Sequence, residues 1–110
     1  MNRIGAAVRP LKWILAFWLL GWGAAAPASE GSDIYKQSCA VCHGVGSPGA
    51  PKLGVRADWA DRLPAGRKAL LHSVLNGKGA MPPKGGDASL SDEQVEAALD
   101  FMLSKVESRP

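Results

Sequence analysis

Two cysteines and a histidine stand close together in the chain, and their spacing points to one kind of chemistry. Cys39 and Cys42 are separated by two residues, and His43 follows directly. On a helical turn, two thiols at this spacing can reach the two vinyl groups on one edge of a porphyrin, with the histidine beneath the ring as an iron ligand. Gly44 then allows the backbone to pass close to the macrocycle. The motif indicates one covalently attached c-type haem.

Three other uses of paired cysteines fit this chain less well. A thioredoxin-like redox pair requires a βαβ setting, and the sequence shows no strand-rich pattern. A structural zinc site requires a second pair of ligands, whereas only His72 and isolated carboxylates remain. A plain disulfide between Cys39 and Cys42 would leave His43 without a role.

Met81 is the favoured ligand for the opposite face of the iron. Its thioether is a soft donor, and Pro82 and Pro83 fix the backbone directly after it. A methionine that fills a core gap is the alternative, although a loop rich in Gly and Pro is an unusual place for one. His72 is the runner-up, but it lies off the apolar stripe of its predicted helix and would require that helix to turn over. A closed His43–Met81 site favours outer-sphere electron transfer, whereas an open site would favour peroxide or small-gas chemistry.

The first 28 residues are expected to form a signal peptide. Three cations and no acid stand in the first twelve residues, and an apolar run to Trp22 follows. Small residues come next, and Ala26 and Ala28 fit cleavage after Ala28. The apolar run is shorter than the ~20 residues that a membrane-spanning helix needs, so retention as an anchor is the less favoured alternative. Export predicts a periplasmic protein. It also agrees with the haem prediction, because c-type haem is attached on the periplasmic side of the bacterial inner membrane.

Residues 29–110 are expected to form one small domain. Three of the thirteen Lys and Arg residues belong to the signal segment, which leaves ten cations against ten acids. A neutral domain gives little support to nucleic-acid binding. Most cations lie between residues 52 and 84, and most acids lie between residues 87 and 107. This separation of charge either orients the protein at a redox partner or is ordinary solvated surface. Because a core of this size is marginal, a buried haem supplies missing apolar volume, and the apoprotein is expected to fold poorly.

Helices are predicted on both sides of the cysteine motif and further along the chain. Ser32 is expected to cap a helix that begins at Asp33 and leads to Cys39. Residues 67–76 predict a second helix, which Gly77 ends.

The last predicted helix opens with a capping box formed by Ser91 and Gln94. Its apolar positions keep helical spacing: Val95, Ala98, Leu99, Met102 and Val106. Residues 44–51 and 77–86 are too rich in Gly and Pro for a regular element. Trp59, in a short turn, is expected to be a core residue beside the haem whose indole N–H can reach a propionate.

Taken together, these residues resemble the class I c-type cytochromes, and most closely the bacterial cytochrome c-five group. The similarity spans residues 29–110 and rests on the cysteine motif, the Trp59 segment and three further segments: residues 49–52, 75–78 and 80–85. It implies an all-α fold of about four helices wrapped round one covalently bound haem, with the first and last helices crossing. Members of that group often carry a second cysteine pair before the last helix, and residues 86–90 contain none.

By this resemblance Cys39 and Cys42 would be the thioether sites, and His43 and Met81 the axial iron ligands. Trp59 and Pro82 are expected to line the haem pocket. The predicted function is that of a one-electron carrier, not an enzyme, between donor and acceptor proteins in the periplasm or membrane, with respiratory complexes as one class of partner. The alternatives are a haem enzyme or sensor with a labile sixth ligand, and a haem subunit of a larger oxidoreductase.

Overall fold

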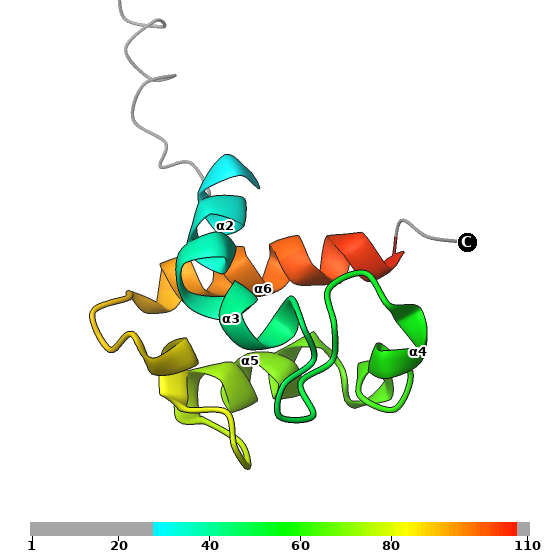
Figure 1. Ribbon diagram of the computed structural model, residues 1–110. Coiled ribbons are helices and arrows are strands. Elements are labelled where there is room, and N and C mark those ends of the chain that lie inside the picture. Colours follow the sequence, from blue (N-terminus) through cyan, green and yellow to red (C-terminus); the bar gives the residue numbers. More distant parts are fainter. Residues whose placement is uncertain (1–27, 108–110) are drawn as a thin grey trace, which may run out of the picture.

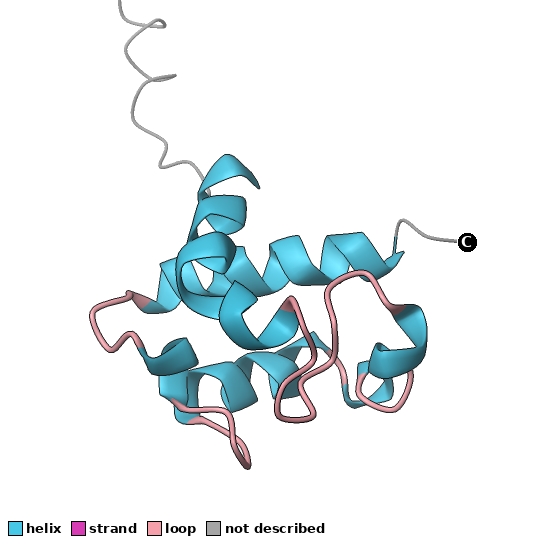
Figure 2. Ribbon diagram, viewed as in Figure 1, coloured by secondary structure: helices cyan, strands magenta, loops and turns pink. Residues whose placement is uncertain are grey.

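The computed structural model describes residues 28–107, and every regular element in that range is a helix (Figure 1). In chain order these are α2 (Ala28–Ile34), η1 (Tyr35–Cys39), α3 (Ala40–His43), α4 (Arg56–Trp59), η2 (Leu63–Ala65), α5 (Arg67–Asn76), η3 (Pro83–Gly86) and α6 (Asp92–Glu107). Figure 2 shows loops joining the helices and no strand in the described part of the chain. The predicted all-α class is confirmed. The proposed signal segment lies outside the described residues, apart from Ala28.

The elements α2, η1 and α3 follow one another directly, so residues 28–43 form one helix with a π-helical segment in its middle. The prediction that Ser32 caps a helix starting at Asp33 is wrong, because Ser32 lies inside α2. Packing explains the difference. Gly31 lies against α6 so closely that a Cβ atom there would overlap the carbonyl oxygen of Ala97, and this contact favours helical backbone before Ser32.

The first and last helices cross, as the resemblance implied. Figure 1 shows α2 crossing the N-terminal half of α6, and the two helices are packed against each other. The rings of Tyr35 and Phe101 meet beside the crossing, with 5.4 Å between their centroids. The buried core continues from there along α6 and reaches α4. Its members are Tyr35, Trp59, Leu99, Met102, Leu103 and Val106.

The capping box of α6 forms as the sequence predicts. The Ser91 backbone N–H donates to Gln94 Oε1 at 2.9 Å, and the Gln94 N–H donates to Ser91 Oγ at 3.1 Å. The apolar positions predicted for this helix are all buried: Val95, Ala98, Leu99, Met102 and Val106. The helix therefore starts where its side chains satisfy the free backbone donors, and one face of it supplies most of the core.

Helix α5 has the predicted bounds, with Gly77 at its C-terminal end. It is tied to α6 by Arg67, whose guanidinium binds Asp100 at 2.7 Å and Glu96 at 3.0 Å. Hydrogen bonds to these carboxylates raise the pKa of Arg67. One cation from the middle of the sequence and two acids from its end therefore meet at this contact. None of the helices in residues 28–107 combines the length and apolarity needed to cross a membrane.

Candidate functional site

The two cysteines lie on consecutive parts of the first helix. Cys39 ends the π-helical segment, in which the Ala40 N–H donates to the Tyr35 carbonyl, and Cys42 lies in α3. Both are half-buried free thiols. Burial raises the pKa of the Cys39 thiol, whereas reactive redox thiols have a lowered pKa. This π-helical segment interrupts the regular α-helical hydrogen bonds and ends at the first cysteine of the motif. Short π-helical segments within α-helices are frequent at functional sites.

His43 is buried and held in one tautomer. Its Nδ1 lies 2.8 Å from the Pro51 carbonyl oxygen. A carbonyl can only accept, so Nδ1 carries a proton, and in the neutral imidazole Nε2 is then the nitrogen with the free lone pair. The His43 carbonyl in turn accepts the Leu53 N–H at 2.9 Å. Metal-binding histidines usually donate their second ring N–H to such a carbonyl, so this residue fits a haem-iron ligand.

Trp59 supports the loop that orients His43. Its side chain is 3% exposed, and its ring lies 6.2 Å from that of His43 with 22° between the planes. Its indole N–H donates to the Lys52 carbonyl at 2.9 Å. The expectation that this N–H reaches a propionate is wrong, because the loop brings a backbone acceptor to it and a buried indole donor takes the nearest one. Pro51 and Lys52 therefore contribute backbone carbonyls that accept hydrogen bonds from His43 and Trp59. The types of side chain in the sequence did not predict this role.

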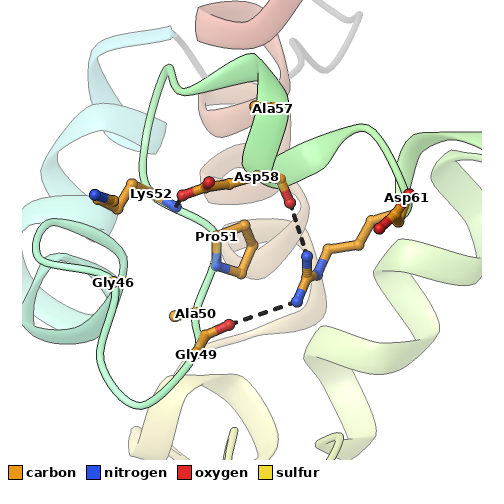
Figure 3. Close-up of a pocket in the computed structure, with 9 residues that line it drawn as sticks. Gly46, Gly49, Ala50, Pro51, Lys52, Ala57, Asp58 and Asp61 are labelled. Carbon is orange, nitrogen blue, oxygen red and sulfur yellow. Dashed lines mark hydrogen bonds between the residues drawn. The ribbon is translucent and has the colours of Figure 1, made fainter.

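A pocket of about 320 Å³ lies on the outer side of this loop (Figure 3). Arg62 spans it, donating to the carbonyls of Asp58 at 2.7 Å and Gly49 at 3.5 Å, and the Lys52 N–H donates to Asp58 Oδ2 at 3.2 Å. Its lining residues are Gly46, Gly49, Ala50, Pro51, Lys52, Ala57, Asp58, Asp61 and Arg62. None of the predicted haem residues lines it, so these polar contacts brace residues 49–52 behind His43.

Met81 lies half-buried in a tight turn after α5. Its N–H donates to the Lys78 carbonyl at 2.9 Å, and its carbonyl accepts the Lys78 N–H at 3.0 Å. Gly77 has a φ of +87°, and a Cβ atom there would lie 3.0 Å from the Met81 carbonyl oxygen and from Pro83 Cδ. The turn therefore rests directly on the backbone of Gly77. Pro82, predicted to line the pocket, is exposed.

The segment after Met81 contacts the cysteine helix. A Cβ atom on Gly85 would lie 2.9 Å from the carbonyl oxygen of Ser38, the residue before Cys39. Element η3 also contacts α5. The fold thus brings the Met81 loop and the cysteine motif, about forty residues apart, to the same region.

The other candidate ligands have structural roles. His72 is exposed, and its Nδ1 and carbonyl contact the side-chain amide of Asn76 at 3.3 and 2.9 Å. This placement confirms the prediction that His72 faces solvent. Met102 is 5% exposed within the core. Within residues 28–107 no cluster of three or more His, Cys, Asp or Glu side chains is placed to hold a metal ion.

Comparison with known proteins points to one family. A family model described as cytochrome c oxidase, cbb3-type, subunit III matches residues 26–102. Cytochrome c-555 of Chlorobaculum tepidum is 43% identical over 82 residues, which cover 71% of this chain and 76% of that protein. Cytochrome c5 of Azotobacter vinelandii is 43% identical over 77 residues, which cover 68% and 93%.

Solved structures agree with these relatives. One similar chain belongs to a crystal structure of an electron-transfer complex of nitrite reductase with cytochrome c; the TM-score is 0.67 at 43% identity, covering 76% of this chain and 99% of that one. A mono-haem ferrocytochrome c of Shewanella putrefaciens has a TM-score of 0.58 at 44% identity, covering 66% and 89%.

Proposed function

Since the chain belongs to the class I c-type cytochromes, we propose that its haem is attached by Cys39 and Cys42 and that His43 and Met81 are the axial iron ligands. The protein is an electron carrier with one covalent haem c, not an enzyme. The haem supplies a reversible one-electron iron couple. The chain's own residues attach it, orient it and hold the two donor atoms.

The hydrogen bond from His43 Nδ1 to Pro51 is the observation that carries this proposal. It fixes the ring orientation and leaves Nε2 as the donor atom. It also makes the ring a stronger electron donor to a metal, because the N–H is polarised by a carbonyl acceptor. Trp59 holds the neighbouring carbonyl of Lys52, so the acceptor stays in place when the charge at the site changes.

Met81 as the second ligand is supported by the rigidity of its loop. The turn between Lys78 and Met81 and the two prolines after it restrict the backbone on both sides of the sulfur. A thioether ligand favours the reduced iron and raises the reduction potential relative to harder ligand sets. Two protein ligands leave no iron position for a substrate, which favours electron transfer over peroxide or gas chemistry.

We further propose that residues 1–28 are a signal peptide, that residues 29–110 form the exported domain, and that the protein works in the periplasm with a redox-protein donor and acceptor. The charge and apolar pattern of the N-terminal segment supports export. The complex of a similar cytochrome c with nitrite reductase supports redox proteins as the class of partner.

The oxidase-subunit description of the matching family model favours one second candidate, a haem subunit of a larger oxidoreductase. Gel filtration of the protein with candidate reductases separates the two.

Replacing one methionine at a time tests the ligand assignment. The oxidised wild type is expected to show the weak near-infrared band of an Fe–S(Met) bond. Met81→Leu is expected to abolish that band and to lower the reduction potential by more than about 100 mV. Met102→Leu, the matched control in the core, is expected to keep both. A high-spin spectrum of the oxidised wild type, or a band that survives Met81→Leu, would contradict the proposal.

A further inference from the structure

Lys84 has an unusual backbone conformation three residues after Met81. Its φ is +55° and its ψ +31°, and it is the one non-glycine residue with positive φ among residues 28–107. Side chains other than glycine rarely adopt this left-handed region, because the Cβ atom approaches the backbone too closely. The two residues that follow, Gly85 and Gly86, also have positive φ. A lysine at the first of these three positions therefore needs a compensating interaction.

The side chain of Lys84 supplies that interaction. Its ammonium donates to the Leu90 carbonyl at 2.7 Å and lies 3.3 Å from Asp92 Oδ1, and its side chain is only 23% exposed. Leu90 and Asp92 flank Ser91, the residue that caps α6. A cation at a helix N-terminus is opposed by the helix dipole. The contact is kept despite that opposition because a charge-assisted hydrogen bond and a carboxylate outweigh it.

The backbone connects this contact to Met81. Pro82 and Pro83 are the only residues between Met81 and Lys84, and each has a fixed φ. The Gly85 N–H donates to the Pro82 carbonyl at 3.2 Å, and Gly85 lies against Ser38 in the cysteine helix. Because only ψ can rotate at the two prolines, a displacement of Lys84 is expected to move Met81 as well.

We propose that Lys84 is a positioning residue for Met81. Its ammonium ties the loop to the start of α6, which keeps the sulfur directed toward the iron when another ligand competes for that position. This inference rests on the proposed function, because it requires Met81 to be the axial ligand.

Imidazole competition in the oxidised, haem-loaded protein tests the proposal. Imidazole displaces a methionine ligand more easily when the methionine loop opens more easily. Lys84→Met keeps the length of the side chain and removes the ammonium, so it is expected to bind imidazole about tenfold more tightly than the wild type, the size of effect that one charge-assisted hydrogen bond gives. Lys84→Arg keeps the charge and donors and is expected to restore most of the wild-type affinity.

Arg67→Met is the matched control for a general loss of stability. It removes the ion pairs between α5 and α6 at a distance in sequence from the loop, so it is expected to lower the urea midpoint without changing imidazole affinity. Equal affinities for Lys84→Met and the wild type, or an equal rise in Arg67→Met, would overturn the proposal. If Lys84→Met fails to take up haem, Lys84→Gly replaces it, because glycine adopts positive φ freely and also lacks the ammonium. A wild type without the Fe–S(Met) band would instead refute Met81 as the ligand.

Discussion

The two residues proposed to bind the iron are held in different ways. His43 lies on a continuous helix, next to the cysteines, and one hydrogen bond to Pro51 fixes its ring. Met81 lies in a loop that depends on separate contacts with α5, through Gly77, and with the start of α6, through Lys84. The histidine is therefore positioned mainly by the helix that carries the cysteines, whereas the methionine is positioned by contacts of its loop with two other helices. Changes around the histidine should affect the whole domain, whereas changes around the methionine should act first on the iron bond.

The largest expected effect comes from removing haem attachment on the histidine side. The double variant with Cys39→Ala and Cys42→Ala is expected to carry no covalent haem and, when refolded from urea without haem, to lose its cooperative unfolding transition. A domain of this size has a marginal core without the cofactor, so the loss amounts to most of its folding free energy, on the order of 5 kcal/mol. Denaturing mass spectrometry and far-ultraviolet circular dichroism measure the two effects.

Met81→Leu is the comparison for that double variant, since it changes the other side of the iron. It should keep its covalent haem and a cooperative transition while it loses the Fe–S band. A cooperative transition in the haem-free cysteine variant would show that the polypeptide folds without the cofactor, and the proposed difference between the two sides would then be wrong.

A smaller effect is expected from the glycine beneath the methionine turn. Gly77→Ala places a Cβ atom 3.0 Å from the Met81 carbonyl oxygen, in a backbone conformation that only glycine adopts readily. We expect a loss of about 2–3 kcal/mol in the free energy of unfolding and a weaker Fe–S band. Urea titration and the near-infrared spectrum of the oxidised protein measure these changes.

Gly79→Ala is the matched control in the same loop. Gly79 also has positive φ, at +58°, but a Cβ atom there meets nothing within 4 Å. Its substitution should cost about 1–2 kcal/mol for the backbone alone and leave the band unchanged. Equal weakening of the band in both variants would mean that the contact between Gly77 and Met81 does not position the sulfur.

The features that could be predicted from sequence are those set by local patterns. The bounds of α5 and the capping box of α6 depend on residues within a few positions of each other, and both agree with the structure. The buried face of α6 follows from helical periodicity in the same way. The cysteine motif belongs with them, because one helical turn sets its spacing.

The features that sequence reasoning missed depend on backbone contacts that the side-chain pattern does not indicate. The helix does not start at Ser32, because Gly31 packs against α6, more than sixty residues later. The Trp59 indole N–H donates to the Lys52 carbonyl, and a backbone acceptor gives no signal in the side-chain pattern. The left-handed conformation of Lys84 follows from where α6 begins. A lysine directly before two glycines is the one local hint of that turn.

The smallest expected effect lies in the loop between Lys84 and α6, where Asp87 helps hold the chain. Hydrogen bonds from the Ser89 hydroxyl and N–H lower the pKa of Asp87, and Ser38 adds a weaker contribution. A carboxyl with a lowered pKa in the folded state stabilises the protein at pH values above its unfolded pKa, about 3.9, and loses that effect as the pH falls through the folded pKa. The urea midpoint of the wild type should therefore exceed that of Asp87→Asn slightly at pH 7, and the difference should shrink as the pH falls below the unfolded pKa and disappear once the folded-state carboxyl is protonated. Groups common to both proteins cancel in this difference, so a gap that does not shrink as the carboxyl becomes protonated at acid pH would show that the Asp87 charge does not hold the methionine side of the molecule.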